Sequence, residues 1–590
     1  MAPSELVSEW TGIASLATWQ TAVKAVVFFL VARCVQFLVE GVRIRAKFRR
    51  MQADGIPIPS NHSLLFGHLL VMRNIMKAYP ADGHSNYLVK ELVLNWRDHF
   101  PAGTASCPKV LYLDIWPMES QPIAVFNDPM LSQALAADRF PPRHERVKFL
   151  GRAVAGPNQL FEWDGAHHRL WRTRLNPGFS MRNLLALVAR GRLVDETEIF
   201  RDRLRKLCGA PGHWGAVFEM LPLTIDLTFD IICGAALDYS PGEQTSGPTV
   251  LQQGLRTIAT EYFSIASLAN LHQRLNPLWN WRFYQIHKSM SRELLPHIER
   301  HLPSAAASNG NAGSADEKKN PLRPKTIIDL TVKEIEEQQG AGKGAKIPDG
   351  FVDDIIGLMK LFIFAGHDTT AINLSFAFHF IQRNPAVLAK LKEEHDAVFG
   401  PDTAAVGETL RQSPQLINAM PYTTAVVKET LRMCPVAPSV RDSPASFVLR
   451  DPETNQLVPT QGFVLVTGVM SLHTHPDIWP RPTEFLPERW LAQEGDELYS
   501  KAATKYAWRP FEWGAMSCIG QELAMIEMKM ALLFVLREVE FRTALDVLDE
   551  QKGKDIKDRP TVWGDAIYQT DVGLGPPVAG LPTQVRLLKT

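Results

Sequence analysis

Cysteine is scarce in this sequence, and neither sign of charge prevails. The 590 residues include 6 cysteines, scattered without a C-x-x-C pair. This spacing excludes a disulfide framework and a cysteine-rich zinc module, and it is typical of reduced thiols in a protein that faces the cytosol. Lys+Arg and Asp+Glu number 63 each, so the bulk charge gives no reason to expect nucleic acid as a partner.

Two other common features are missing. No small-residue cleavage site follows the apolar N-terminal stretch, so we expect a segment that stays on the protein rather than a removed signal peptide. No G-x-G-x-x-G motif lies between a strand and a helix, so we expect no dinucleotide-binding unit in this chain. The composition, 45% hydrophobic and 21% charged, is ordinary for a protein with a large globular core.

The N-terminal stretch over residues 13–39 is apolar and about long enough to cross a bilayer. Lys24 and Arg33 interrupt it, which leaves two interpretations open: an amphipathic helix on the membrane surface, or a signal anchor whose Arg33 reaches toward the interface. We favour the spanning anchor. Five basic residues follow within residues 43–50, while Glu5 and Glu9 precede the stretch, so the positive-inside rule places the rest of the chain in the cytosol.

We therefore divide the chain into an anchor with its basic stop (residues 1–50), a proline-rich hinge (51–70) and a single large domain (71–590). The segments "VLYLDIW" and "PIAVFND" read as a pair of strands. Most of the remainder carries apolar residues at the three- and four-residue spacing of helices. A stretch rich in Ser, Gly and charge predicts a disordered insertion at 303–346, with a short helix inside it. The expected fold is mainly α with small β sheets.

The decapeptide "FEWGAMSCIG" (residues 511–520) sets Cys518 between two glycines. A thiolate binds iron when its charge is stabilised and its sulfur is accessible. Gly514 and Gly520 allow the backbone to bend around the sulfur, and the helical sequence after Gly520 places Cys518 at a helix N-terminus, where the dipole lowers a thiol pKa. Taken alone, the pattern also fits a buried structural cysteine at a loop–helix junction.

Two helical stretches carry polar residues that their apolar surroundings do not explain. In "AVVKETLRMCPVAP", Glu429 and Arg432 share a helix face, and Arg489 in "LPERW" offers the further partner that a buried pair needs. In "FIFAGHDTTAINLSFAF", a glycine, Asp368 and Thr369 interrupt an apolar helix, which is either a local kink or a groove beside a functional acid. Because the kink and the acid coincide, we favour a functional groove.

Together these motifs resemble those of the cytochrome P450 monooxygenases. The loop F-x-x-G-x-x-x-C-x-G, the helix E-x-x-R with a later P-E-R, and the helix A-G-x-D-T-T stand in that family's order, and the family's W-x-x-x-R helix aligns through "NPGFS". The resemblance runs from about residue 57 to the C-terminus. Three positions depart from the family: Met516 stands where Arg or His is usual, His168 where Trp is usual, and Trp490 where Phe is commoner.

In the resembled family the cysteine thiolate is the fifth ligand of heme iron, which implies a heme b held by Cys518. The resemblance also implies roles for the other motif residues. Phe511, Gly514 and Gly520 shape the loop; Glu429, Arg432 and Arg489 form a buried charge network; Ala365 and Gly366 open a groove for O₂; Asp368 and Thr369 carry protons; and Arg172, His168, Arg441 and His473 bind the heme propionates. Because Met516 is uncharged, we expect the last four residues to supply the missing charge.

The resemblance implies an oxidoreductase that inserts one atom of O₂ into a lipophilic small molecule, by hydroxylation or epoxidation. Electrons are expected from NADPH through a separate NADPH–cytochrome reductase, with cytochrome b5 as a further candidate donor. The C-terminal tail and His168 resemble fungal microsomal members, which implies an endoplasmic-reticulum protein with a single N-terminal anchor, a cytosolic catalytic domain and a role in secondary metabolism. Three alternatives stay open: a fatty acid or alkane hydroxylase, a heme-thiolate isomerase or dehydratase that uses no O₂, and a non-enzymatic heme-binding protein.

Overall fold

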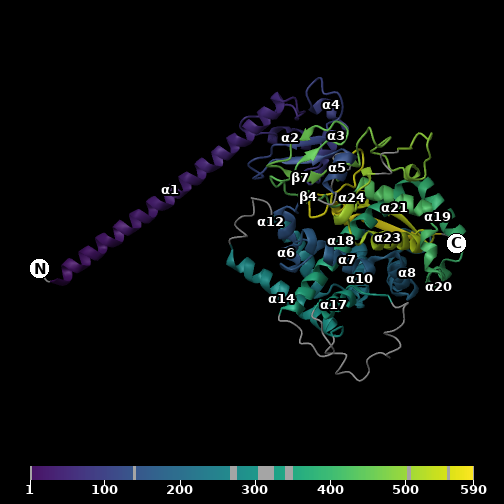
Figure 1. Ribbon diagram of the computed structural model, residues 1–590. Helices are drawn as coiled ribbons and strands as arrows, with labels where there is room; N and C mark the ends of the chain where they lie inside the picture. The colour runs from purple at the N-terminus through teal and green to yellow at the C-terminus, as the bar shows by residue number, and fades with distance from the viewer. Residues whose placement is uncertain are drawn as a thin grey trace.

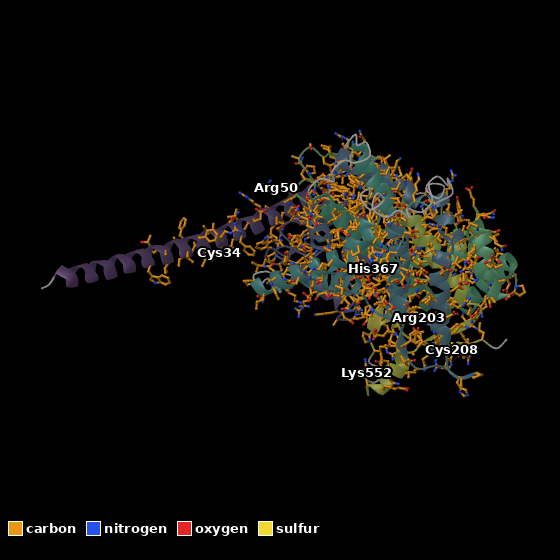
Figure 2. All side chains as sticks on the ribbon, turned by 90° about the horizontal axis from the view of Figure 1, so that it is seen from below. Cys34, Arg50, Arg203, Cys208, His367 and Lys552 are labelled. Atoms are coloured by element: carbon orange, nitrogen blue, oxygen red, sulfur yellow. The ribbon has the colours of Figure 1, made fainter. Side chains whose placement is uncertain are left out.

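One long helix, α1 (Pro3–Ala53), projects from a mostly helical body in the computed structural model (Figure 1). The structure describes residues 3–136, 141–265, 276–302, 324–338, 350–500, 506–553 and 559–588. Cys34 lies on the projecting part of α1, and Arg50 lies where the helix reaches the body (Figure 2). The predicted class, mainly α with small β sheets behind an N-terminal helix, is confirmed.

Helices form most of the described chain, and short strands form three small sheets. The helices after α1 are α2 (Leu69–Met76), α3 (Asn86–Leu94), α4 (Trp96–His99), α5 (Pro129–Leu135), α6 (Glu145–Ala155), α7 (Gly165–Leu175), α8 (Met181–Ala189), α9 (Arg192–Leu207), α10 (Met220–Leu237), α11 (Glu243–Ser246), α12 (Val250–Ile265), α14 (Pro277–Glu299), α17 (Ile327–Gln338), α18 (Phe351–Arg383), α19 (Pro385–Phe399), α20 (Val406–Gln412), α21 (Pro421–Met433), α22 (Val469–Leu472), α23 (Gln521–Val535) and α24 (Leu545–Gln551). The strands are β1 (Val110–Leu113), β2 (Ile123–Phe126), β3 (Phe218–Glu219), β4 (Val440–Arg441), β5 (Leu449–Arg450), β6 (Leu457–Val458), β7 (Val464–Thr467), β8 (Val539–Thr543) and β9 (Pro582–Leu587).

The largest sheet has the strand order β1-β2-β7-β4 and joins segments that are far apart in the sequence. The predicted strand pair is confirmed, because β1 and β2 run antiparallel with Val110 opposite Phe126. β7 then pairs in parallel with β2, and β4 pairs with β7. An isolated bridge between Arg143 and Arg441 adds a further segment beside β4. The sheet therefore brings two arginines from distant parts of the chain onto neighbouring backbones.

The centre of the body is a helix pair, α10 and α18, whose close packing requires a glycine. Gly366 of α18 faces Ile232 of α10, and a Cβ at Gly366 would lie 2.6 Å from Cγ1 of Ile232. No side chain fits at that distance. The missing side chain of Gly366 thus lets the two helices approach, and Ile232 occupies the space that the sequence predicted as a groove for O₂.

Within the described part of the chain, three helices are long and apolar enough to cross a membrane: Thr21–Ala53 in α1, α10 and α18. The apolar windows of α10 and α18 are 72% and 78% buried in the protein, so these two are core helices. The window in α1 is 0% buried. Because such a large apolar surface is unfavourable in water, α1 is the candidate membrane anchor.

The body begins inside α1 rather than after the predicted hinge. Ile44, Phe48 and Met51 of α1 are buried in a cluster with residues of the β1-β2-β7-β4 sheet, so the helix passes through the boundary predicted at residue 50. Ile58, in the predicted hinge, is buried in the same cluster. Of the predicted insertion, residues 303–323 and 339–346 lie outside the described residues, and the short helix expected inside it is α17.

Candidate active site

The loop that carries Cys518 makes one tight turn before α23 begins at Gln521. Gly514 has a φ of +73°, and a Cβ there would lie 2.3 Å from the carbonyl oxygen of Ala136, so only glycine fits. The amide of Cys518 donates to the carbonyl of Phe511 at 2.7 Å, which closes the loop. Gly520 is under less constraint, because its φ is −85° and a Cβ would only touch the Cys518 sulfur at 3.9 Å.

The Cys518 sulfur is surrounded by protein atoms and yet keeps accessible surface. Burial raises the pKa of this thiol above its ordinary value, while the amides of Gly520 and Gln521 and the charge of Arg172 act in the opposite direction. The helix N-terminus therefore lowers the pKa as predicted, but burial outweighs it. A thiol in this setting loses its proton when a positively charged metal replaces it.

The motif in α18 presents some residues to an open side and buries the others. Ala365, Asp368 and Thr369 are partly exposed, whereas His367 is buried near the centre of the domain (Figure 2). The Thr369 hydroxyl donates to the carbonyl of Ala365 at 2.9 Å. Burial raises the pKa of Asp368, against the opposing charges of His367 and Arg256. This stretch of α18 thus combines a hydroxyl with a carboxyl whose pKa is raised.

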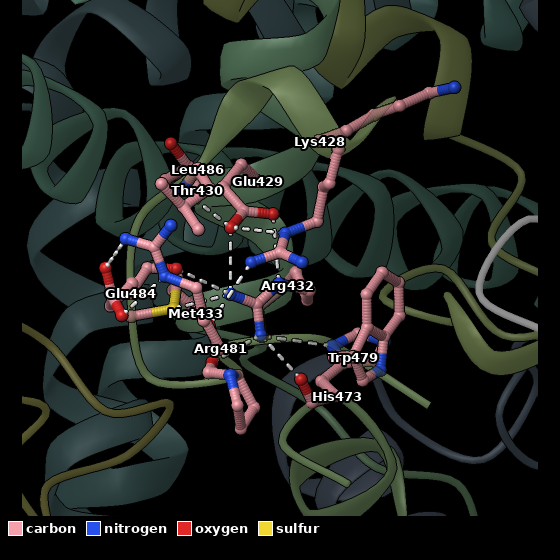
Figure 3. Close-up of polar contacts among 12 residues, drawn as sticks. Lys428, Glu429, Thr430, Arg432, Met433, His473, Trp479, Arg481, Glu484 and Leu486 are labelled. Carbon is pink, nitrogen blue, oxygen red and sulfur yellow. Dashed lines mark hydrogen bonds and ion pairs between the residues drawn. The ribbon is translucent and has the colours of Figure 1, made fainter. Parts of the chain in front are cut away.

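Glu429 of α21 is the centre of a buried charge network (Figure 3). Its carboxylate accepts from Arg432 at 2.8 and 2.9 Å, from Arg489 at 3.0 Å, and from the backbone amide of Leu486 at 3.0 Å. The indole N–H of Trp490 adds a fifth donor at 3.0 Å, which a phenylalanine cannot supply. Although burial alone would raise the pKa of Glu429, Arg432 and Arg489 hold it below its ordinary value.

His473 lies within this network and not with the other residues predicted to bind propionates. Its Nδ1 is 3.2 Å from the carbonyl oxygen of Arg432, and its Nε2 accepts from the backbone amide of Arg509 at 2.9 Å. Burial and the charge of Arg432 keep the pKa of His473 well below its ordinary value, so the ring is neutral. Both ring nitrogens are engaged with backbone, which leaves neither for a carboxylate. His473 joins the backbone around Arg432 to the cysteine loop.

Three arginines and a histidine instead form a group beside the cysteine loop, which we call the cationic group. The group consists of Arg143, His168, Arg172 and Arg441. Arg172 of α7 donates to the carbonyl of Ser517 at 2.5 Å, directly beside Cys518. Burial, and then the charges of Arg441 and Arg172, lower the pKa of Arg143 to about 10. Cations that lie close enough to lower one another's pKa are favourably placed to bind an anion.

His168 belongs to this group as a neutral hydrogen-bond donor. Burial, Arg143 and Arg172 lower its pKa to about 4, so it carries no charge near neutral pH. Its Nε2 lies 3.4 Å from Nη2 of Arg143, while its Nδ1 is buried and has no hydrogen-bond partner among the described residues. With Nε2 as the acceptor, Nδ1 carries the proton. A buried N–H without a partner fits a carboxylate-bearing cofactor, as the indole N–H of a tryptophan would at this position.

Arg143 is the member of this group that sequence reasoning missed. It stands in the loop "PPRHER" with no motif around it. Its backbone bridges to Arg441, a residue almost 300 positions later, and its guanidinium donates to the carbonyls of Leu160 and Trp163 at 2.9 Å. These contacts bring Arg143 to the site. Met516 contributes no charge to the loop, so the positive charge near Cys518 comes from α7, from β4 and from the segment beside β4.

The structure brings together a cysteine at a loop–helix junction, arginines beside it, and a carboxyl of raised pKa on a core helix. This arrangement fits a class of protein that binds an acidic cofactor through a thiolate. Comparison with known proteins identifies the family. The family described as cytochrome P450 matches residues 112–561, and the chain belongs to that family. Membership implies an oxidoreductase that carries heme. The accessible sulfur of Cys518 and the Nδ1 of His168, which has no partner among the described residues, fit a bound heme.

Matches to three curated relatives cover 80% to 94% of this chain. "Cytochrome P450 monooxygenase polC" of Polytolypa hystricis is 29% identical over 94% of this chain and 93% of its own length. "Cytochrome P450 monooxygenase acrF" of Aspergillus aculeatus is 29% identical over 80% of this chain and 93% of its own. "Cytochrome P450 monooxygenase ptmG" of Penicillium ochrochloron is 27% identical over 93% of this chain and 94% of its own length. The chain is therefore similar to fungal P450 monooxygenases, and the predicted resemblance is confirmed.

Proposed function

We propose that this protein is a membrane-anchored heme-thiolate monooxygenase that inserts one oxygen atom into a lipophilic small molecule in fungal secondary metabolism. The observation that carries the proposal is the accessible sulfur of Cys518 at the N-terminus of α23, a helix that packs against α18. The fungal monooxygenase relatives support the reaction class and the setting. The exposed apolar part of α1 supports the anchor.

The cofactor would be held at two places. Cys518 would provide the sulfur ligand to the iron, and Arg143, His168, Arg172 and Arg441 would bind the two propionates. When bound, the heme supplies the activation of O₂ and the transfer of one oxygen atom to the substrate. His473 is left out of this set, because backbone groups engage both of its ring nitrogens.

Asp368 and Thr369 would hold and pass on protons for the reaction. Burial raises the pKa of Asp368, so its carboxyl would take up a proton more readily than an exposed carboxyl and could release it to Thr369 or to the reacting groups. The Thr369 hydroxyl donates to Ala365 at rest, and rotation about χ1 would free it to pass a proton on. The small side chain of Ala365, which is partly exposed, would leave room for O₂ next to that hydroxyl, whereas Ile232 occupies the space beside Gly366.

Electrons would come from outside the chain. NADPH would reduce a separate NADPH–cytochrome reductase, with cytochrome b5 as a further candidate donor. The basic residues that follow the apolar stretch of α1 favour a cytosolic catalytic domain on the endoplasmic reticulum. A membrane-held enzyme is suited to lipophilic substrates, because these partition into the bilayer.

Thr369→Ala tests the proposed reaction. We expect NADPH consumption with reductase to continue while product falls about tenfold or more, because the proton supply that couples the two is lost. The measurement is the ratio of product formed to NADPH oxidised. Thr409→Ala is a matched control, because Thr409 of α20 donates to the i−4 carbonyl of Ala405 at 2.8 Å, as Thr369 does to Ala365. Turnover that persists without NADPH and O₂ would instead favour an isomerase or dehydratase.

A second test concerns the uncharged Met516. Arg441→Ala is expected to speed heme loss about ten- to a hundredfold, because a charge-assisted hydrogen bond contributes roughly 1.5–3 kcal/mol. Adding Met516→Arg to that variant should partly restore retention, whereas adding Met516→Leu should not. The measurement is the rate of heme transfer to excess apomyoglobin. Equal rates in all four proteins would contradict the idea that the cationic group replaces a charge in the loop.

A further inference from the structure

Glu512, in the cysteine loop, has a backbone conformation that favours glycine. Its φ is +57°, in the left-handed region that residues with a side chain seldom adopt. Its own carboxylate helps to hold this turn, because Oε2 accepts from the amide of Trp513 at 3.2 Å. The amide of Cys518 donates to the carbonyl of Phe511, the residue before Glu512, so Glu512 lies next to the proposed metal ligand. A strained residue beside a functional group indicates that its side chain has a use there.

The partner of Glu512 is Arg509, a buried arginine of the same loop; we call the two residues the loop pair. Arg509 is 1% exposed, and its Nη2 donates to Oε2 of Glu512 at 2.5 Å. Nε and Nη1 of Arg509 and Oε1 of Glu512 are buried and have no hydrogen-bond partner among the described residues. One side-chain hydrogen bond thus joins two charges whose burial ordinarily requires several.

The buried network around Glu429 shows a well-satisfied ion pair in the same protein. The guanidinium of Arg432 donates to both oxygens of Glu429 and to three backbone carbonyls. The loop pair has far fewer partners than this network. Because a buried pair stabilises a fold only when its remaining polar groups are satisfied, stability is a poor explanation of the loop pair.

The charges of the loop pair act on groups around them, since few hydrogen bonds offset them. Burial lowers the pKa of Arg441 in β4, and the charge of Glu512 opposes this effect. Glu512 therefore acts on a charged residue outside its own loop. A charge acts over a longer distance in a protein interior than in water, and the two oxidation states of an iron bound at Cys518 differ by one charge. The loop pair is thus placed to change their relative free energies.

We propose that the loop pair sets the reduction potential of the iron held by Cys518, with Glu512 lowering this potential and Arg509 raising it. The inference rests on the proposed function, in which Cys518 ligates heme iron. The step concerned is the transfer of one electron from an external donor, which is oxidised, to the iron, which is reduced; no bond is formed or broken. A negative charge favours the more positive, oxidised iron, and a positive charge favours the reduced iron. Glu512 and Arg509 are positioning residues, because they act through their charges on the ligated iron.

The test measures the midpoint potential of the full-length holoenzyme by spectroelectrochemical titration. At an effective dielectric constant of about 20, a unit charge about 10 Å away changes the ratio of reduced to oxidised iron by about tenfold. For a one-electron couple this ratio corresponds to about 59 mV. We expect Glu512→Gln to raise the potential by about this amount and Arg509→Gln to lower it by a similar amount.

A double variant that carries both changes separates charge from a general disturbance of the loop. Its potential should return close to that of the unchanged protein, because two opposite charges are removed together. If Glu512→Gln alone does not fold, since it leaves Arg509 buried and unpaired, the double variant is compared with Arg509→Gln. These two proteins differ only in the charge at position 512, so the double variant should have the higher potential by about tenfold in the same ratio.

Glu540→Gln is the matched control. Glu540 pairs with Arg586 at 2.7 Å and lies in β8, beyond the far end of α23, whose 15 residues span roughly 22 Å. This change should leave the potential unmoved.

The outcomes distinguish a failure of this inference from a failure of the proposed function. Equal potentials in all variants, with the thiolate band of the carbon-monoxide spectrum retained, would overturn the role of the loop pair and leave the heme-thiolate proposal intact. Shifts of the same sign in both single variants would also overturn it, because they would indicate a disturbed loop. Absence of the thiolate band from the unchanged protein would contradict the proposed function itself.

Discussion

Cys518→Ser is expected to abolish the spectrum of a thiolate-bound heme while leaving the protein folded. The sulfur is the ligand proposed for the iron, and a serine hydroxyl does not ionise at neutral pH to replace it. The loop itself should persist, because its shape depends on Gly514 and on the backbone hydrogen bond from Cys518 to Phe511, which serine keeps. Monooxygenase activity should be lost.

The measurement is the carbon-monoxide difference spectrum of the reduced protein, with circular dichroism to verify folding. Cys208→Ser is the matched control, because Cys208 is also incompletely buried but follows the end of α9, where its sulfur donates to the carbonyl of Leu204 at 3.4 Å. An unchanged thiolate band in the Cys518 variant would remove the basis of the proposed function.

Glu429→Gln is expected to destabilise the protein by about 3–5 kcal/mol, because it leaves two buried arginines without their counter-charge. Gln has the same size, but its amide group turns a donor toward Arg432 or Trp490. With typical domain stabilities of about 5–15 kcal/mol, this loss should lower both the yield of folded protein and its heme content. Trp490→Phe removes one of five donors and should cost only about 1 kcal/mol.

Urea unfolding of the purified proteins measures both effects. Glu484→Gln is the control, because Glu484 pairs with Arg481 at the same three-residue separation but on the surface, and this change should leave the midpoint unmoved. A Glu429 variant as stable as the Glu484 variant would show that the buried network does not stabilise the fold.

The same network predicts a dependence on pH. The pKa of Glu429 is lower in the folded protein than its ordinary value, so the folded state binds fewer protons than the unfolded state. Its contribution is therefore complete above the ordinary pKa and is lost as the pH falls toward the lowered one. The Glu429→Gln protein should show a weaker loss of stability over that acidic range.

The spacing of residues that are close in the sequence accounts for the features that could be predicted. Cys518, its glycines and the following helix lie within a few residues of one another, so spacing alone revealed the loop. The pairing of Glu429 with Arg432 is set by helical periodicity, and the apolar run before the basic residues of α1 marks the anchor. These features depend on chain neighbours, whose relative positions secondary structure determines.

Contacts between segments far apart in the sequence determined the site features that could not be predicted. Arg143 reaches the cationic group because its backbone pairs with Arg441 and its guanidinium donates to the carbonyls of Leu160 and Trp163. Backbone groups of Arg432 and Arg509 engage both ring nitrogens of His473, so His473 is left out of the proposed propionate set. Burial reverses the expected direction of the Cys518 pKa. The sequence by itself determined the family and predicted Cys518 as the metal ligand and α1 as the anchor. The tertiary structure decided which charges lie around Cys518, because burial and hydrogen-bond partners arise only when separate parts of the chain pack together.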